Sequence, residues 1–116
     1  MLVKDDVVLA GLQPVMRPVL REANRIWEAH GEELVVTATR DGVHSAASWH
    51  PYGYALDLRT RFWTISEAIE VAQELKDALP EYDIIHHTKA VVDRTVTSHI
   101  HAEIGNRLAA KLGVLY

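Results

Sequence analysis

The most informative stretch of the chain reads Ser48-Trp49-His50-Pro51-Tyr52-Gly53-Tyr54-Ala55-Leu56-Asp57. It places a histidine and an aspartate seven positions apart, with a glycine and an alanine between them. A second stretch reads Ser98-His99-Ile100-His101-Ala102-Glu103 and adds two more histidines. Two imidazoles and one carboxylate can hold a zinc ion with a fourth position open, which is the pattern of catalytic zinc sites. We therefore expect a ligand set of His50, Asp57 and one histidine of the His-Ile-His pair.

Residues 98–104 are predicted to form a strand, in which side chains alternate between two faces. His99, His101 and Glu103 then share one face, while apolar residues occupy the other. A strand with an apolar back and a His/His/Glu front suits the floor of a metal site. The plain alternative for Glu103 is an exposed strand carboxylate.

The stretch 54–59 is predicted to be a second strand with the same kind of alternation. Asp57 shares a face with Ala55, whose small side chain leaves room for an ion beside the carboxylate. The plain alternative for Asp57 is a salt bridge at the strand end, with Arg59 or Arg61 as its partner.

The rest of the chain shows helix and strand patterns in turn. Apolar residues recur at helical spacing over 14–30, where Pro18 is expected in the first turn, and over 65–79, after the capping box Thr64-Ile65-Ser66-Glu67. The residues of the second helix expected to face the core are Ile65, Ala68, Ile69, Ala72, Leu75 and Leu79. Further strands are predicted at 34–39, 82–86 and 89–93, and a short helix at 107–112. This mix predicts an α+β fold with a largely antiparallel sheet packed with helices.

Length and composition narrow the class of protein. A chain of 116 residues is expected to form one domain, residues 1–116. The chain has no cysteine, which excludes cysteine-based zinc sites and thiol catalysis. A net charge of −4 gives no basic footprint, so we expect no nucleic-acid partner. The sequence shows neither a signal peptide nor an apolar run of about 18 residues, so we expect synthesis in the cytoplasm and no membrane partner.

The first stretch resembles a known signature. Its pattern Ser48-x-His50-x-x-Gly53-x-Ala55-x-Asp57 matches the S-x-H-x-x-G-x-A-x-D motif of the zinc D-Ala-D-Ala peptidases at all five specified positions. Their superfamily also holds the phage L-alanyl-D-glutamate endopeptidases and the hedgehog signalling domain. His101 is similar to the third zinc ligand of that superfamily, and Thr37-Ala38-Thr39-Arg40 looks like a variant of its S-G-Y-R segment. The resemblance covers roughly residues 35–104.

This resemblance implies a hedgehog/DD-peptidase-like fold in which His50, Asp57 and His101 bind Zn²⁺ and water takes the fourth place. Zinc lowers the pKa of bound water toward about 7 and polarises the scissile carbonyl. Arg40 matches the family arginine that contacts substrate or developing negative charge. The alternative for Arg40 is an ordinary surface arginine.

The general base departs from the family pattern. Superfamily peptidases carry an acidic base three residues before the last ligand, or six residues before it in the hedgehog-like spacing, and here these positions are Ser98 and Thr95. The candidates that remain are His44 and His99, which we favour, followed by His87, Asp93 and Glu103. Glu103 has a further interpretation as a partner that orients a ligand.

The expected function is hydrolysis of peptidoglycan stem or cross-link peptides by a zinc metallopeptidase. Such a domain would suit a phage or prophage lysis protein (an endolysin), or a subunit of a phage particle that opens the host cell wall beside other particle proteins. One alternative is a binding or structural module that keeps the zinc and has lost hydrolysis. Another is a dipeptidase acting on D-amino-acid dipeptides.

Overall fold

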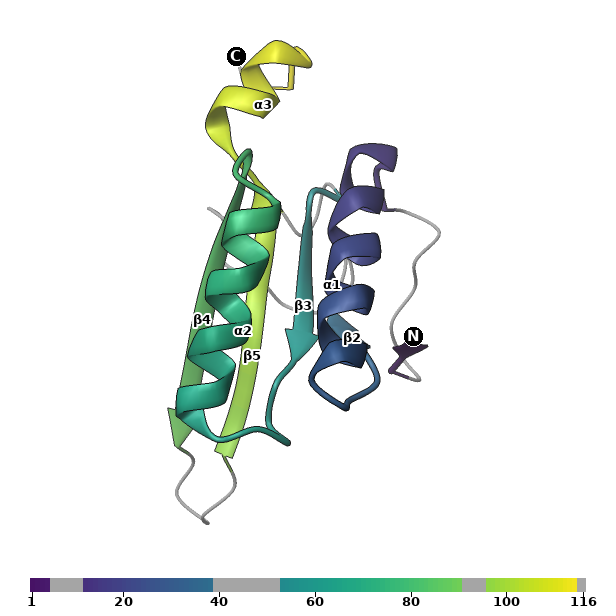
Figure 1. Ribbon diagram of the computed structural model, residues 1–116. Coiled ribbons are helices and arrows are strands. Elements are labelled where there is room, and N and C mark those ends of the chain that lie inside the picture. Colours follow the sequence, from purple (N-terminus) through teal and green to yellow (C-terminus); the bar gives the residue numbers. More distant parts are fainter. Residues whose placement is uncertain (5–11, 39–52, 91–95, 115–116) are drawn as a thin grey trace.

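The computed structural model describes residues 1–4, 12–38, 53–90 and 96–114. Within them a five-stranded mixed sheet and three α-helices form an α+β fold (Figure 1). The elements are β1 (Leu2–Val3), a 3-10 turn (Pro14–Met16), α1 (Arg17–Ala29), β2 (Val35–Ala38), β3 (Ala55–Arg59), α2 (Ile65–Ala78), β4 (Tyr82–Ala90), β5 (Val96–Ile104) and α3 (Asn106–Lys111). None of the helices in these ranges is long and apolar enough to cross a membrane.

The sheet is largely antiparallel, as the sequence predicts. Its strand order is β1-β2-β3-β5-β4, and only the β1–β2 pair is parallel. β1 was not predicted, because two residues are too short to show a period. β4 is one strand of nine residues where the sequence predicts two shorter ones, and it pairs with β5 along its whole length.

Helix α1 begins as the sequence predicts, with Pro18 in its first turn. Proline is tolerated there because the first N–H groups of a helix have no partner within the helix. After α1 the chain turns at Gly31, whose φ of 79° lies in the left-handed region that glycine adopts without strain. Trp27 is fully buried and donates a hydrogen bond of 3.0 Å from Nε1 to the carbonyl oxygen of Arg59, which joins α1 to the end of β3.

Helix α2 is capped as predicted, since the Thr64 hydroxyl accepts a hydrogen bond of 3.2 Å from the Glu67 N–H. Its buried residues are Ala68, Val71, Ala72 and Leu75. The expectation that Ile65 and Ile69 face the core is wrong, because their side chains are 57% and 56% exposed. Successive residues turn by about 100° around a helix, so a buried stripe that includes Val71 leaves the two isoleucines at its outer edge.

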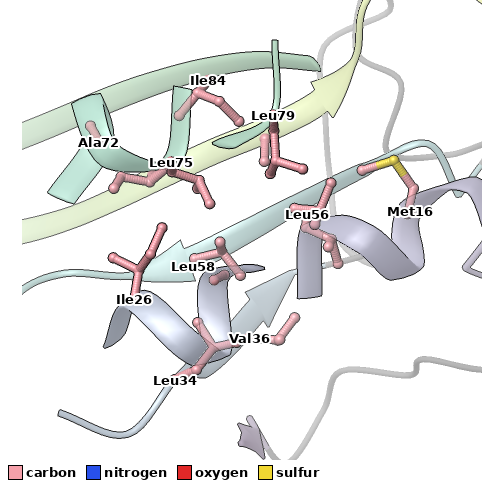
Figure 2. Packing of buried hydrophobic residues seen from close by; sticks show 14 of the residues in the cluster. Met16, Ile26, Leu34, Val36, Leu56, Leu58, Ala72, Leu75, Leu79 and Ile84 are labelled. Atoms are coloured by element: carbon pink, nitrogen blue, oxygen red, sulfur yellow. The ribbon is translucent and has the colours of Figure 1, made fainter. Parts of the chain in front are cut away.

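The core lies between one face of the sheet and the helix pair α1 and α2 (Figures 1 and 2). Figure 2 shows Leu58 of β3, Ile26 of α1 and Leu75 of α2 within the same cluster of buried side chains. The strand residues of this cluster are Val36, Leu56, Leu58, Ile84, Ile100, Ala102 and Ile104. Because side chains alternate along a strand, the residues between them point to the other face of the sheet.

A histidine at the end of α1 connects the two large helices. His30 donates through Nε2 to Glu74 and lies 3.4 Å through Nδ1 from a carboxylate oxygen of Glu67, both on α2. The hydrogen bond to Glu74 raises the pKa of His30, and the second carboxylate adds to this effect, although burial opposes it. The cation also lies at the C-terminal end of α1, where positive charge is favourable.

Replacement of this histidine should change the pH dependence of stability. A histidine whose pKa is higher in the folded chain stabilises fully below its unfolded value of about 6.5 and loses that contribution as pH rises through the folded value. His30→Gln should therefore lower the free energy of unfolding at pH 6 by up to about 1 kcal/mol, and by less at pH 9. Urea unfolding of both proteins at the two pH values measures this difference. An equal loss at both values would show that the interaction with Glu67 and Glu74 is not ionic.

Candidate metal site

The polar side chains singled out in the sequence lie on the sheet face opposite the core. In the register of β3 and β5, Asp57 is directly opposite His101, and Ala55 is opposite Glu103. The residues that alternate with them are buried under α1 and α2, which confirms the predicted division of both strands into an apolar and a polar face. Pairing of the strands thus brings together side chains that are 44 residues apart in the chain.

The His101 ring lies between two carboxylates. Its Nδ1 is 2.9 Å from Oδ1 of Asp57, and its Nε2 is 3.2 Å from Oε1 of Glu103. The three side chains are 14%, 17% and 19% exposed for His101, Asp57 and Glu103 respectively. This is therefore a mostly buried cluster of charged groups. Among the described residues, the alternatives of an Asp57 salt bridge to Arg59 or Arg61 and of an exposed Glu103 do not match it.

The charges of this cluster compensate one another. Burial by itself lowers the pKa of His101, because it penalises the charged imidazolium. The hydrogen bond and the charge of Asp57, together with Glu103, outweigh burial, so the pKa of His101 is raised. The two carboxylates thus favour the positively charged form of the His101 ring that lies between them.

The separation of Asp57 and His101 fits two ligands of one zinc ion. Donor atoms at about 2.0–2.1 Å from a tetrahedral zinc lie about 3.3 Å apart, close to the 2.9 Å between Oδ1 and Nδ1. The nitrogen that would bind is Nδ1, and Nε2 would then donate to Glu103. A carboxylate on the second nitrogen of a ligating histidine is the usual arrangement around protein-bound zinc.

The third ligand predicted from the sequence, His50, lies outside the described residues, as do Arg40 and His44. Among the residues that the structure describes, no three histidine, aspartate or glutamate side chains form a group that could hold a metal. Asp57 and Glu103 do not form such a group with His101 because they contact opposite edges of its ring. The described part of the site therefore supplies two of the three predicted ligands and one orienting carboxylate.

His99 lies on the same face as His101, one pleat further along β5. The β4–β5 register places His87 opposite it, and the two rings are 5.1 Å apart between centroids. His87 is also 6.4 Å from the His101 ring, measured in the same way. Three imidazoles thus form a continuous row at the edge of the predicted metal site. The third base candidate from this part of the chain, Asp93, lies outside the described residues.

Ser98, at the position where superfamily peptidases carry the base, has other partners. Its hydroxyl forms hydrogen bonds of 2.7 Å with Thr60 Oγ1 and 3.1 Å with His86 Nε2. Thr60 is fully buried, and burial, followed by the charge of His87, lowers the pKa of His86. These bonds connect β5 to β4 and to the end of β3, which is a structural role.

A small cavity beside the site was not anticipated from the sequence. It has a volume of about 170 Å³ and is lined by Lys4, Thr37, Arg59, Arg61, Ser98 and His99. In the sequence, Arg59 and Arg61 are expected only as salt-bridge partners of Asp57. The signal that was available is the alternation of β3, which places Arg59 on the face of Asp57, while Arg61 follows the end of the strand.

Comparisons with known protein families, with curated proteins and with solved structures find no match. The site geometry and the sequence signature are therefore the basis for assigning a function.

Removal of His101 should destabilise the chain even without metal. His101→Ala leaves Asp57 and Glu103 mostly buried and without this donor, so the free energy of unfolding should fall by about 1–3 kcal/mol. His87→Ala is the matched control, because His87 is an exposed histidine on the neighbouring strand, and its loss should cost about 0.5 kcal/mol or less. Urea unfolding at pH 7 with a chelator measures both. Equal losses would contradict the role of His101 as the shared partner of Asp57 and Glu103.

Proposed function

We propose that this chain is a zinc metallopeptidase of hedgehog/DD-peptidase-like fold that hydrolyses peptidoglycan stem or cross-link peptides. The observation that carries the proposal is the direct opposition of Asp57 and His101 on β3 and β5, at a separation suited to two ligands of one zinc ion. The S-x-H-x-x-G-x-A-x-D signature supports it from the sequence, since it contains Asp57 and adds His50. The mixed sheet supports it too, because its helix pair covers only the face away from these ligands.

In this proposal His50, Asp57 and His101 hold the zinc ion. The ion would lower the pKa of a bound water toward 7 and polarise the scissile carbonyl. Glu103 accepts a hydrogen bond from His101 Nε2, and in doing so it holds the ring with Nδ1 toward Asp57. We therefore assign Glu103 to positioning His101 rather than to accepting the proton of the water.

Proton transfer then falls to a histidine. His99 lies on the site face, and its contact with the exposed ring of His87 gives a route to solvent. We propose that His99, together with His44, takes a proton from the attacking water and returns it to the leaving amine. Arg40 is proposed to contact the substrate or the negative charge that develops on its carbonyl oxygen.

A second candidate is a zinc-containing module that binds wall peptides or serves a structural role without hydrolysis. The observation that favours it is that the usual position of the acidic base is occupied by Ser98. The hydroxyl of Ser98 forms hydrogen bonds with Thr60 and His86. For the first candidate, we propose that the chain opens the host cell wall, as a phage lysis protein or as part of a phage particle.

Zinc content tests the ligand set. The purified chain should contain one zinc ion, and His50→Ala, Asp57→Ala and His101→Ala should each lose it. Glu103→Gln should weaken zinc binding by about 10–100-fold, because the ring of His101 loses its charged acceptor. The matched control is Glu70→Gln on the exposed surface of α2, which should leave affinity unchanged. Metal analysis and competition with a chromogenic chelator measure these values, and a wild-type chain that reconstitution cannot load would sink the proposal.

Hydrolysis separates the two candidates. Purified cell walls should lose turbidity with the zinc-loaded chain, a chelator should stop the loss, and added zinc should restore it. His99→Ala should lower the rate by about 10²–10⁴-fold at unchanged zinc content, because it removes the proposed proton acceptor. If His87→Ala or Glu103→Gln abolishes the rate while His99→Ala keeps it, the assignment of the base is wrong. A fully loaded wild type that releases no peptide fragment by mass analysis would favour the binding module.

A further inference from the structure

The cavity beside the proposed metal site is lined mainly by basic side chains. Lys4, Arg59 and Arg61 line it together with His99, and Thr37 and Ser98 complete the described lining. We call this cavity the arginine pocket. A lining that holds one lysine and two arginines, with no carboxylate among the described lining residues, is suited to a negatively charged ligand group.

Arg59 and Arg61 both line the arginine pocket, and the charge of Arg61 acts on Arg59. In the part of the chain that the structure describes, neither Arg59 nor Arg61 forms an ion pair, whereas Asp57 is engaged with His101. Burial, and then the like charge of Arg61, lowers the pKa of Arg59. The main chain at Arg59 is fixed, since its carbonyl oxygen accepts the hydrogen bond from Trp27. A bound anion would relieve the repulsion between the two guanidinium groups.

The position of the arginine pocket relates it to the proposed metal site. Arg59 pairs with His99 in the β3–β5 register, directly next to the pair formed by Asp57 and His101. Two residues along a strand correspond to about 7 Å, which is also the length of two residues of an extended peptide. A ligand whose peptide bond lies at Asp57 and His101 can therefore place a group one or two residues further on in the pocket.

We propose that the arginine pocket binds a carboxylate of the substrate, one or two residues from the bond that is cut, with Arg59 and Arg61 as its main ligands. The choice of a peptide carboxylate rests on the proposed peptidase function, since guanidinium groups bind carboxylate and phosphate with similar geometry. The volume of about 170 Å³ suits one end of a ligand rather than a whole one, because cavities for complete small molecules reach about 300–1,000 Å³. The pocket thus determines which wall peptides are accepted.

Calorimetric titration of the full chain with two matched peptides tests this inference. The probes are N-acetyl-D-alanyl-D-alanine and its C-terminal amide, titrated once into the zinc-loaded chain and once with a chelator, which prevents both hydrolysis and binding of the carboxylate to metal. The acid should bind at least about tenfold more tightly than the amide under both conditions, a factor typical of one charge-assisted hydrogen bond. Arg59→Gln and Arg61→Gln should each remove most of this preference.

The control substitutions separate charge from structure. Arg59→Lys keeps the charge and should retain part of the preference. Arg107→Gln changes an exposed arginine on α3, beyond the opposite end of β5, and should leave the preference intact. If Arg59→Gln fails to fold, Arg61→Gln decides, because Arg61 is exposed and lies outside the strand.

Equal affinity for acid and amide in the wild type would overturn the proposal, and so would a preference that survives Arg61→Gln. Inorganic phosphate is titrated as a third probe. If phosphate binding depends on Arg59 and Arg61 while acid and amide bind equally, the pocket is a phosphate site rather than a carboxylate site. Zinc content and wall hydrolysis are measured on the same preparations. If the chain prefers the acid but hydrolyses nothing, the arginine pocket is supported and the peptidase function is contradicted. If the chain hydrolyses wall peptides but does not prefer the acid, the peptidase function is supported and the arginine pocket is contradicted.

Discussion

The alternation of side chains along β3 and β5 is the constraint on which the candidate site depends. Leu56 and Leu58 of β3, like Ile100, Ala102 and Ile104 of β5, are fully buried in the core cluster. Their burial directs Asp57 and His101 to the other face, and the strand register then places the two side chains directly opposite each other. A slip of one residue in either strand would exchange the two faces and bury the charges in the apolar core. The energy that stabilises the core therefore also sets the geometry of the site.

The cluster around His101 combines charged side chains that are mostly buried. Two carboxylates at low exposure are costly unless a positive charge or hydrogen-bond donors accompany them. The His101 ring offers one nitrogen to Asp57 and the other to Glu103, and its raised pKa favours the positively charged form. A divalent cation on the Nδ1 side would take over the neutralisation of Asp57, while Glu103 keeps its hydrogen bond. The same three side chains thus suit the metal-free and the proposed metal-bound protein.

The sign of the charge changes over a short distance along the sheet. Carboxylates gather at Asp57 and Glu103, and two residues beyond Asp57 on β3 lies Arg59, which lines the arginine pocket together with Arg61. His99 is opposite Arg59 and lines the arginine pocket. A ligand that carries a polarised carbonyl group and, one or two residues away, a carboxylate matches this sequence of charges better than a neutral or cationic ligand does.

The sequence by itself determined the class of fold, the capped start of α2 and the polar faces of the two central strands. These features follow from local rules, which are the period of apolar residues, the hydrogen bond of a capping threonine and the alternation of a strand. Tertiary structure decided the outward position of Ile69, the contact between His87 and His99, the place of Glu103 on His101 and the grouping of Arg59 with Lys4. Each of these depends on the rotation of a helix against the sheet or on the register between strands. Rotation and register are set by packing between segments far apart in the chain, so no local pattern of residues encodes them.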